Sequence, residues 1–177
     1  MGARVVEIGE RNMPTALAHK YPECFPQNFE AEILPKGIED IELFVYRVCT
    51  NGIINKDSFL STFEEIQLGK KPKLMNWTKQ LKKPSTYSTS CDTSLNSIKN
   101  VLKCLKDYHP NPIIAKGTAT FRYGPLQRTS DRTGKETTHV DWWLYADADP
   151  SGDFALCEDW IMEIYFENIP YIGDLAL

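Results

Sequence analysis

Four stretches of the chain have a composition that is typical of strands. Residues 41–48 (IELFVYRV), 112–121 (PIIAKGTATF) and 139–145 (HVDWWLY) are rich in β-branched and aromatic side chains, and 85–91 (STYSTSC) is a shorter β-prone stretch. Gly117 interrupts the second stretch, which indicates a bulge or a close approach of another backbone. These four segments predict the sheet of the protein.

Hydrophobic residues at spacings of three and four predict one clear amphipathic helix, with Asp92 or Thr93 as its N-cap. The apolar stripe of this helix consists of Leu95, Ile98, Val101, Leu102 and Leu105. A shorter helix is expected over residues 59–66, after Asp57 and Ser58, and the segment DADPSGD predicts the start of an acidic helix over about residues 151–168. Helices interspersed with strands and joined by long polar loops favour an α+β fold with a mixed or antiparallel sheet and flanking helices.

The length and composition of the chain indicate a single globular domain. The chain has 177 residues, of which 42% are hydrophobic and 25% charged, so residues 1–177 are expected to form one compact domain with one core. No apolar stretch approaches the ~18–20 residues of a membrane helix, and the charged N-terminal stretch does not resemble a secretory signal. We therefore expect a soluble, cytoplasmic protein.

Cysteine and histidine do not predict a metal site. The five cysteines form no C-x-x-C pair, and the three histidines are far apart in the sequence. An odd number of unpaired cysteines is typical of reduced thiols in the cytoplasm. No metal is therefore expected.

The formal net charge of −4 conceals an uneven distribution of charge. From Asp141 to the C-terminus there are nine acidic residues and no Lys or Arg. The connector of residues 66–84 has the opposite composition, with several lysines and no acidic residue. A contact with the phosphates of a nucleic acid through this connector is expected to use Lys70, Lys71, Lys73, Lys82 and Lys83.

Three polar groups lie on or beside the expected strands. Arg47 stands within an otherwise apolar strand, where its charge has to be paired or turned outward. Residues 88–90 (STS) lead directly into the capped helix. His139 and Asp141 are two residues apart on a strand and therefore share a face of it.

The order of these groups resembles that of the R-S-E class of ADP-ribosyltransferases. In that class an Arg on the first strand precedes a Ser-Thr-Ser strand and a helix, and a loop then leads to an acidic residue at the start of a later strand. The resemblance spans about residues 45–145, the expected site region. His139-x-Asp141 stands where the family has Glu-x-Glu.

The resemblance implies an NAD-dependent transferase that acts on a macromolecular target. Arg47 would grip the phosphates of NAD, and Ser88, Thr89 and Ser90 would shape the nicotinamide pocket. Asp141 would stand in for the catalytic Glu and stabilise positive charge as nicotinamide leaves, with His139 beside it in the catalytic set. The loop of residues 123–138 would face the substrate.

Two other interpretations of the same residues remain open. In the first, Cys91 at a helix N-terminus is a nucleophile, His139 its base and Asp141 the residue that orients the base. In the second, the protein is a non-catalytic binding or accessory module. That module would use the Lys-rich connector and an aromatic surface drawn from Trp142, Trp143, Tyr145 and Trp160.

Overall fold

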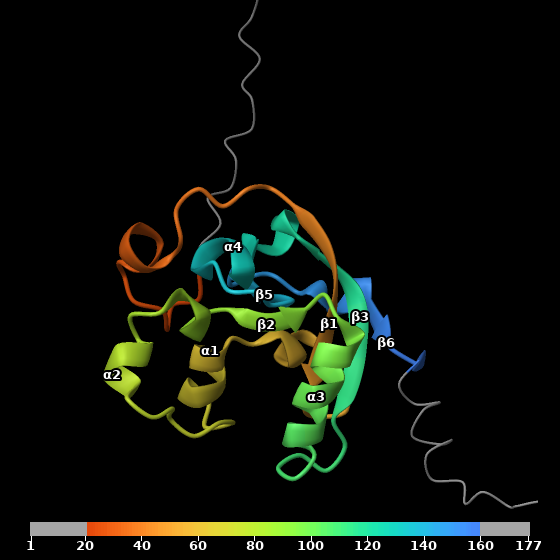
Figure 1. The fold of residues 1–177 in the computed structure, drawn as a ribbon. Coiled ribbons are helices and arrows are strands. Elements are labelled where there is room, and N and C mark those ends of the chain that lie inside the picture. The colour runs from red at the N-terminus through yellow and green to blue at the C-terminus, as the bar shows by residue number, and fades with distance from the viewer. Residues whose placement is uncertain (1–20, 160–177) are drawn as a thin grey trace, which may run out of the picture.

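A six-stranded antiparallel sheet forms the centre of the protein in the computed structural model, which describes residues 21–159 (Figure 1). The strand order across the sheet is β4-β5-β2-β1-β3-β6. The α+β class with an antiparallel sheet is confirmed. The strands are β1 (Glu42–Cys49), β2 (Thr89–Asp92), β3 (Ile113–Thr120), β4 (Leu126–Arg128), β5 (His139–Trp142) and β6 (Phe154–Leu156).

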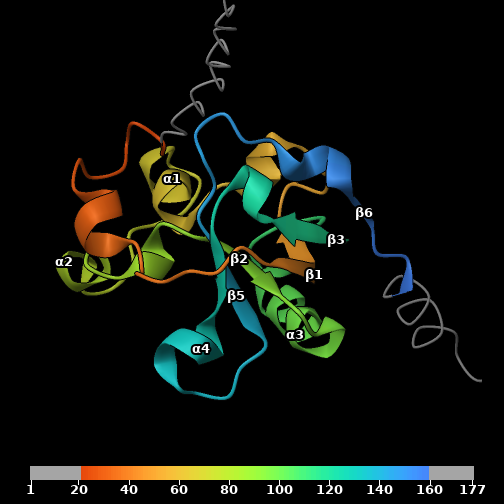
Figure 2. The ribbon, with the colours of Figure 1, turned by 90° about the horizontal axis from the view of Figure 1, so that it is seen from above.

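Short helices surround the sheet. α3 lies alongside β1 and β3, α1 and α2 lie together near the start of β2, and α4 lies against β4 and β5 (Figures 1 and 2). Five single-turn segments, η1 to η5, connect these elements in the described part of the chain. The helices are α1 (Thr62–Gln67), α2 (Trp77–Gln80), α3 (Leu95–Leu105) and α4 (Thr129–Thr133), and the turns are η1 (Phe29–Ile33), η2 (Lys56–Phe59), η3 (Pro84–Thr86), η4 (Phe121–Tyr123) and η5 (Pro150–Asp153).

The predicted amphipathic helix is α3, with its boundary moved by one residue. Its N-cap is Ser94, whose hydroxyl accepts a hydrogen bond from the backbone N–H of Ser97. Ile98 and Leu102 are buried against the sheet, whereas Val101 is 44% exposed. One edge of the predicted apolar stripe is therefore left open to solvent.

The sheet consists of two halves that are joined at a single point. β1 and β3 pair without interruption from Glu42 opposite Thr120 to Cys49 opposite Ile113, and β2 pairs with β5 over its whole length. Between β1 and β2, by contrast, one residue pair is in register, Tyr46 opposite Asp92. Beyond this pair the two halves of the sheet diverge.

Both tryptophans of the HVDWWLY segment are fully buried. Trp142 lies in the core between the sheet and η2, and its indole N–H donates to the carbonyl of Gly124 at 3.0 Å. Trp143 lies in an aromatic cluster with Phe29 and Tyr87 and donates to the carbonyl of Pro84 at 2.9 Å. The prediction that this pair contributes to a binding surface is therefore wrong. Trp160 lies outside the described residues.

The expected acidic helix over residues 151–168 is wrong in its first part. Asp149 caps a turn as the sequence predicts, but that turn is the four-residue η5 and it leads directly into β6. β6 pairs with β3, and Phe154 packs edge-on against Phe59 with ring centroids 4.8 Å apart. Pairing and burial override the local helix signal here. Residues 160–168 lie outside the described residues.

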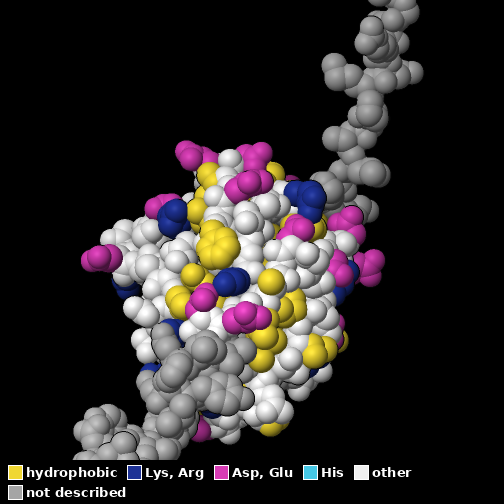
Figure 3. Space-filling model, turned by 90° about the vertical axis from the view of Figure 1, so that its right-hand side faces the viewer, with side chains coloured by type: hydrophobic (Ala, Val, Ile, Leu, Met, Phe, Trp, Pro, Cys, Tyr) yellow, Lys and Arg dark blue, Asp and Glu magenta, His cyan; other side chains and the backbone are white. Residues whose placement is uncertain are grey.

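The side of the molecule that carries β3 and β6 exposes hydrophobic side chains between charged ones (Figure 3). Phe44 is 54% exposed there. An ion pair joins Lys116 to Asp159 at 2.9 Å, and another joins Arg122 to Asp153 at 2.7 Å. Exposed pairs of this kind contribute only about 0–1 kcal/mol each, so the polar contacts that hold the fold lie in its interior.

Gly117 marks a close backbone approach rather than a bulge, since the β1–β3 register runs through it unbroken. A Cβ atom at this position would lie 2.4 Å from the carbonyl oxygen of Asp153 and 2.7 Å from the ring of Phe154. Gly117→Ala should therefore push β6 away and lower the free energy of unfolding by about 1–3 kcal/mol in urea titrations.

Gly152→Ala is the matched control, because a Cβ atom at Gly152 meets no atom within 4 Å. It should change stability by less than about 0.5 kcal/mol. Equal stability of the two variants would show that β6 does not need the close approach at Gly117.

Candidate functional site

An open cleft of about 600 Å³ lies where the two halves of the sheet diverge. Its floor is formed by the ends of three neighbouring strands and carries Arg47, Ser90 and His139. One wall is the solvent-exposed edge of α3, and the other comes from η2, α1 and the residues that follow α1. The walls carry Ile98, Val101, Leu105, Asp57, Thr62, Glu65, Lys70 and Lys71.

Arg47 spans the divergence between the two halves of the sheet. Its Nη1 donates to the carbonyl of Ser90 on β2 at 2.7 Å, and its Nε donates to the carbonyl of Ser58 at 3.0 Å. Its Nη2 donates to the carbonyl of Leu60 at 3.3 Å. A guanidinium carries five N–H groups, so two of them have no partner within residues 21–159 and can serve a ligand in the cleft.

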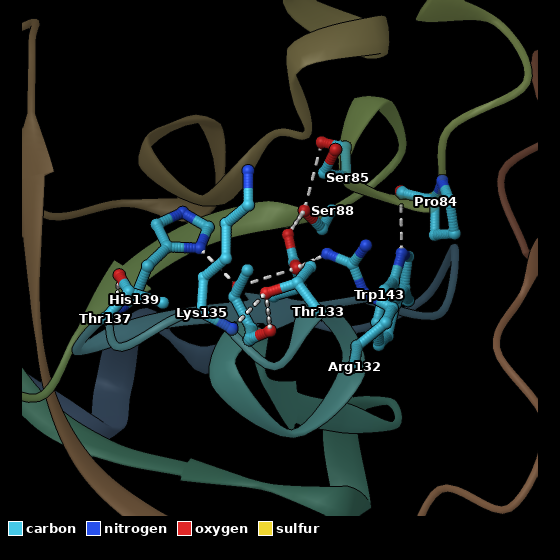
Figure 4. A network of polar contacts seen from close by, with 11 residues as sticks. Pro84, Ser85, Ser88, Arg132, Thr133, Lys135, Thr137, His139 and Trp143 are labelled. Atoms are coloured by element: carbon cyan, nitrogen blue, oxygen red, sulfur yellow. Dashed lines mark hydrogen bonds and ion pairs between the residues drawn. The ribbon is translucent and has the colours of Figure 1, made fainter.

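A buried carboxylate lies behind the floor of the cleft. Asp141 is fully buried, and one of its oxygens accepts a hydrogen bond from the hydroxyl of Ser88 at 2.7 Å (Figure 4). The other oxygen accepts from the hydroxyl of Thr129 at 2.9 Å and forms an ion pair with Arg132. An unpaired charge in this position would be very costly, and these partners, two of them from α4, compensate for its burial.

His139 connects this buried network to the cleft. Its Nδ1 lies 2.7 Å from the hydroxyl oxygen of Thr129, which in turn donates to Asp141. The ring is partly exposed and lines the cleft. An uninterrupted chain of hydrogen bonds therefore runs from the Asp141 carboxylate to the floor of the cleft.

The predicted site residues divide into three groups. Arg47, Ser90 and His139 line the cleft, whereas Ser88 and Asp141 are bonded to each other beneath it. Thr89 is separate from both groups, because its buried hydroxyl donates to the backbone carbonyl of Phe59. Thr89 therefore holds η2 against the sheet and does not face the cleft.

Thr129 and Arg132 are site residues that the sequence pattern did not reveal. They lie on α4, within the segment for which the sequence predicts a polar loop facing the substrate. The signal that could have pointed to them is Asp141 itself, because a carboxylate on an apolar strand requires a cation and hydroxyl donors nearby. The spacing of residues along the chain does not identify which of the neighbouring Arg and Lys side chains pairs with Asp141.

The hypothesis of a Cys91 nucleophile finds no support in the geometry. Cys91 is 1% exposed, and burial raises the pKa of its thiol to about 12. The side chain packs with Cys49 and Val140 in the core. At neutral pH the thiol is protonated, and in the described part of the chain it makes no hydrogen bond to His139.

Within residues 21–159 no three His, Cys, Asp or Glu side chains gather as ligands for a metal ion. None of the helices in the same part of the chain has the length and the apolar composition of a membrane span. Comparison of the sequence with protein-family models and with curated proteins, and of the fold with solved structures, gave no match.

The residues of the cleft combine four kinds of group. The cleft contains a guanidinium with two free N–H groups, an imidazole and an apolar wall from α3, and a buried carboxylate lies directly behind its floor. Lys70 and Lys71 stand on its rim, 2.7 Å and 3.6 Å from the carboxylates of Asp57 and Glu65. Such a cleft suits a ligand that has an anionic part, a flat apolar part and a centre where positive charge changes.

Arg47→Lys should lower the free energy of unfolding by about 2 kcal/mol, because a lysine ammonium cannot reach all three carbonyls and leaves at least one of them unsatisfied. Urea denaturation monitored by tryptophan fluorescence measures this loss. Arg128→Lys, at an exposed position on β4, is the matched control and should have an effect below about 0.5 kcal/mol. Equal stability of the two variants would mean that the Arg47 guanidinium does not hold the halves of the sheet together.

Proposed function

We propose that the cleft binds NAD and that the protein transfers the ADP-ribosyl group to a macromolecular target. The observation that carries this proposal is the adjacency of β1, β2 and β5 in the sheet. It brings Arg47, Ser90 and His139 to one cleft with Asp141 behind them. The same residue types, in the same order along the chain, underlie the resemblance to the R-S-E class of ADP-ribosyltransferases.

The two N–H groups of Arg47 that have no partner within residues 21–159 suit the diphosphate of NAD, because a guanidinium binds phosphate oxygens through parallel hydrogen bonds. The apolar wall of α3, which includes Val101, is suited to a flat ring. Binding of NAD is therefore expected to use the N–H groups of Arg47 and the apolar side chains of α3 that are not fully used in contacts within the protein.

Asp141 differs from a catalytic carboxylate that touches the substrate. It is fully buried and paired with Arg132, so in this conformation it acts on a ligand through its field and through Thr129. Electrostatic stabilisation of the charge that develops as nicotinamide leaves is the largest contribution expected of such a group. This arrangement is a departure from the family pattern and makes Asp141 the residue to test first.

Calorimetric titration with NAD, combined with chromatographic measurement of nicotinamide release, tests the proposal. The unaltered protein should bind NAD and release nicotinamide. Asp141→Asn should lower the release rate about 10²-fold with little change in the affinity for NAD, because the carboxylate does not touch the ligand. Circular dichroism of the variant checks that it is folded.

Two further variants identify the binding site. Val101→Trp should fill the cleft and abolish NAD binding, whereas Ile53→Trp, at another exposed hydrophobic residue that does not line the cleft, should leave binding intact. Absence of NAD binding in the unaltered protein overturns the proposal. Binding without nicotinamide release also overturns the transferase function and leaves an NAD-binding module.

A nucleic-acid target is our second proposal, and it rests on a difference among the lysines of the connector. Lys70 and Lys71 pair with acidic residues on the rim of the cleft. Lys73, Lys82 and Lys83 are exposed and form no ion pair within the described part of the chain. Unpaired surface lysines release counterions from a phosphate backbone when they bind it.

Replacement of Lys73, Lys82 and Lys83 by Ser should reduce the salt dependence of nucleic-acid binding, because the slope falls by about one for each phosphate that the protein no longer neutralises. Fluorescence anisotropy with a labelled oligonucleotide at several salt concentrations measures it. Lys36, Lys103 and Lys135, all exposed and outside the connector, provide a control triple variant with the same change of charge. Identical slopes for the two triple variants would eliminate the connector as the segment that binds nucleic acid.

A further inference from the structure

A hydrogen-bonded chain from Asp141 through Thr129 determines which nitrogen of His139 carries a proton. We propose that His139 is the general base of the cleft, which takes up the proton of the acceptor of the ADP-ribosyl group, and that Thr129 is the residue that positions it. The inference rests on the proposed function for the identity of the donor. The state of His139 itself follows from contacts within the protein.

The direction of each hydrogen bond in the chain is fixed by its neighbour. The Asp141 carboxylate, paired with Arg132, can only accept. The single hydroxyl proton of Thr129 is donated to it at 2.9 Å. The oxygen of Thr129 can then only accept from His139, 2.7 Å away, so Nδ1 must carry a proton.

A neutral imidazole protonated at Nδ1 has its lone pair on Nε2. The ring of His139 lines the cleft, and in Figure 4 the dashed line starts from one of its two ring nitrogens and leaves the other without a drawn contact. Among the described residues Nε2 has no hydrogen-bond partner. The cleft therefore holds a fixed acceptor for a proton, held in orientation from behind by a buried carboxylate.

Charged groups of both signs surround the ring. Asp92 lies directly opposite His139 across the β2–β5 pair, and Asp141 is connected through Thr129. Arg47 lies on the floor of the cleft and Arg132 behind Asp141. A hydrogen bond from Nδ1–H to a hydroxyl that is itself bonded to a carboxylate orients the base, as in catalytic sites where a third group holds the histidine.

The reaction balances with His139 in this role. The bond between the ribose C1′ and the pyridinium nitrogen of NAD breaks, and its electron pair leaves with nicotinamide, which becomes neutral. A bond forms between C1′ and the nucleophilic atom of the acceptor, and the acceptor's proton passes to Nε2. Imidazolium then releases this proton to solvent, so the products are ADP-ribosylated acceptor, nicotinamide and a proton.

The tautomer can be measured without NAD, by long-range ¹H–¹⁵N correlation of the histidine rings. At a pH where the ring is neutral, His139 of the unaltered protein should carry its proton on Nδ1. Thr129→Val removes the hydroxyl and should allow the Nε2–H form to appear, whereas Thr129→Ser keeps the hydroxyl and should keep Nδ1–H. Thr133→Val on the same helix is the matched control, because the Thr133 hydroxyl donates to the backbone carbonyl of Thr129 and not to the network.

Kinetics with NAD then test the base. Thr129→Val and His139→Gln should each lower nicotinamide release about 10²-fold without weakening NAD binding, and Thr129→Ser should restore most of the rate. Water alone should give ADP-ribose. Methanol as a probe should give the methyl glycoside of ADP-ribose, detected by mass spectrometry.

The possible outcomes separate the two proposals. If His139 of the unaltered protein carries its proton on Nε2, the inference fails whether or not NAD is cleaved. If the tautomer is as stated but no nicotinamide is released, the proposed function fails and the positioning by Thr129 stands. If His139→Gln releases nicotinamide at the rate of the unaltered protein, His139 is not the general base.

Discussion

The contact between β1 and β2 is the constraint on which the rest of the structure depends. Because Tyr46 and Asp92 form the single residue pair in register between these strands, the backbone ladder contributes little to joining the two halves of the sheet. Arg47 adds a connection by donating to the carbonyl of Ser90 on β2 and to the carbonyls of Ser58 and Leu60. The guanidinium therefore occupies space that a ladder of backbone hydrogen bonds would fill in a continuous sheet. The cleft exists because the strands diverge at this point.

A second constraint follows from the first. Asp141 lies on β5 with its side chain in the interior, where the strands diverge. A buried carboxylate requires hydrogen-bond donors, and these have to come from outside its own strand. Ser88 comes from the start of the neighbouring strand, and Thr129 and Arg132 come from α4. This requirement explains why a helix of only five residues lies in the middle of a polar segment. The same donors shield Asp141 from the cleft and leave His139 as the group that faces it.

Four of the six strands and the main helix could be predicted from the sequence because their signals are local. Residues 41–48 match β1 within one residue, and the stripe around Ile98 and Leu102 identifies α3. β4, β6 and α4 could not be predicted in this way. Phe154 becomes part of a strand because it packs on Phe59 and pairs with β3, and α4 has no apolar stripe because its contacts are polar. Both depend on residues distant in the chain, which periodicity within a short window does not register.

The candidate site shows the same division between local and distant signals. That Arg47, Ser88 and Asp141 each need a partner could be inferred from their positions in apolar or strand segments, but the identity of each partner depends on strand order. The order β5-β2-β1 joins Ser88 to Asp141 and Arg47 to Ser90.

Most hydrogen-bonding groups of the cleft are thus used within the protein, and a ligand can bind only to the donors and acceptors that these contacts leave without a partner. Two N–H groups of Arg47 and Nε2 of His139 meet that condition, and they offer, respectively, donors for an anion and an acceptor for a proton. A cleft with this pair of functions is suited to a ligand that carries an anionic group and also a group that gives up a proton.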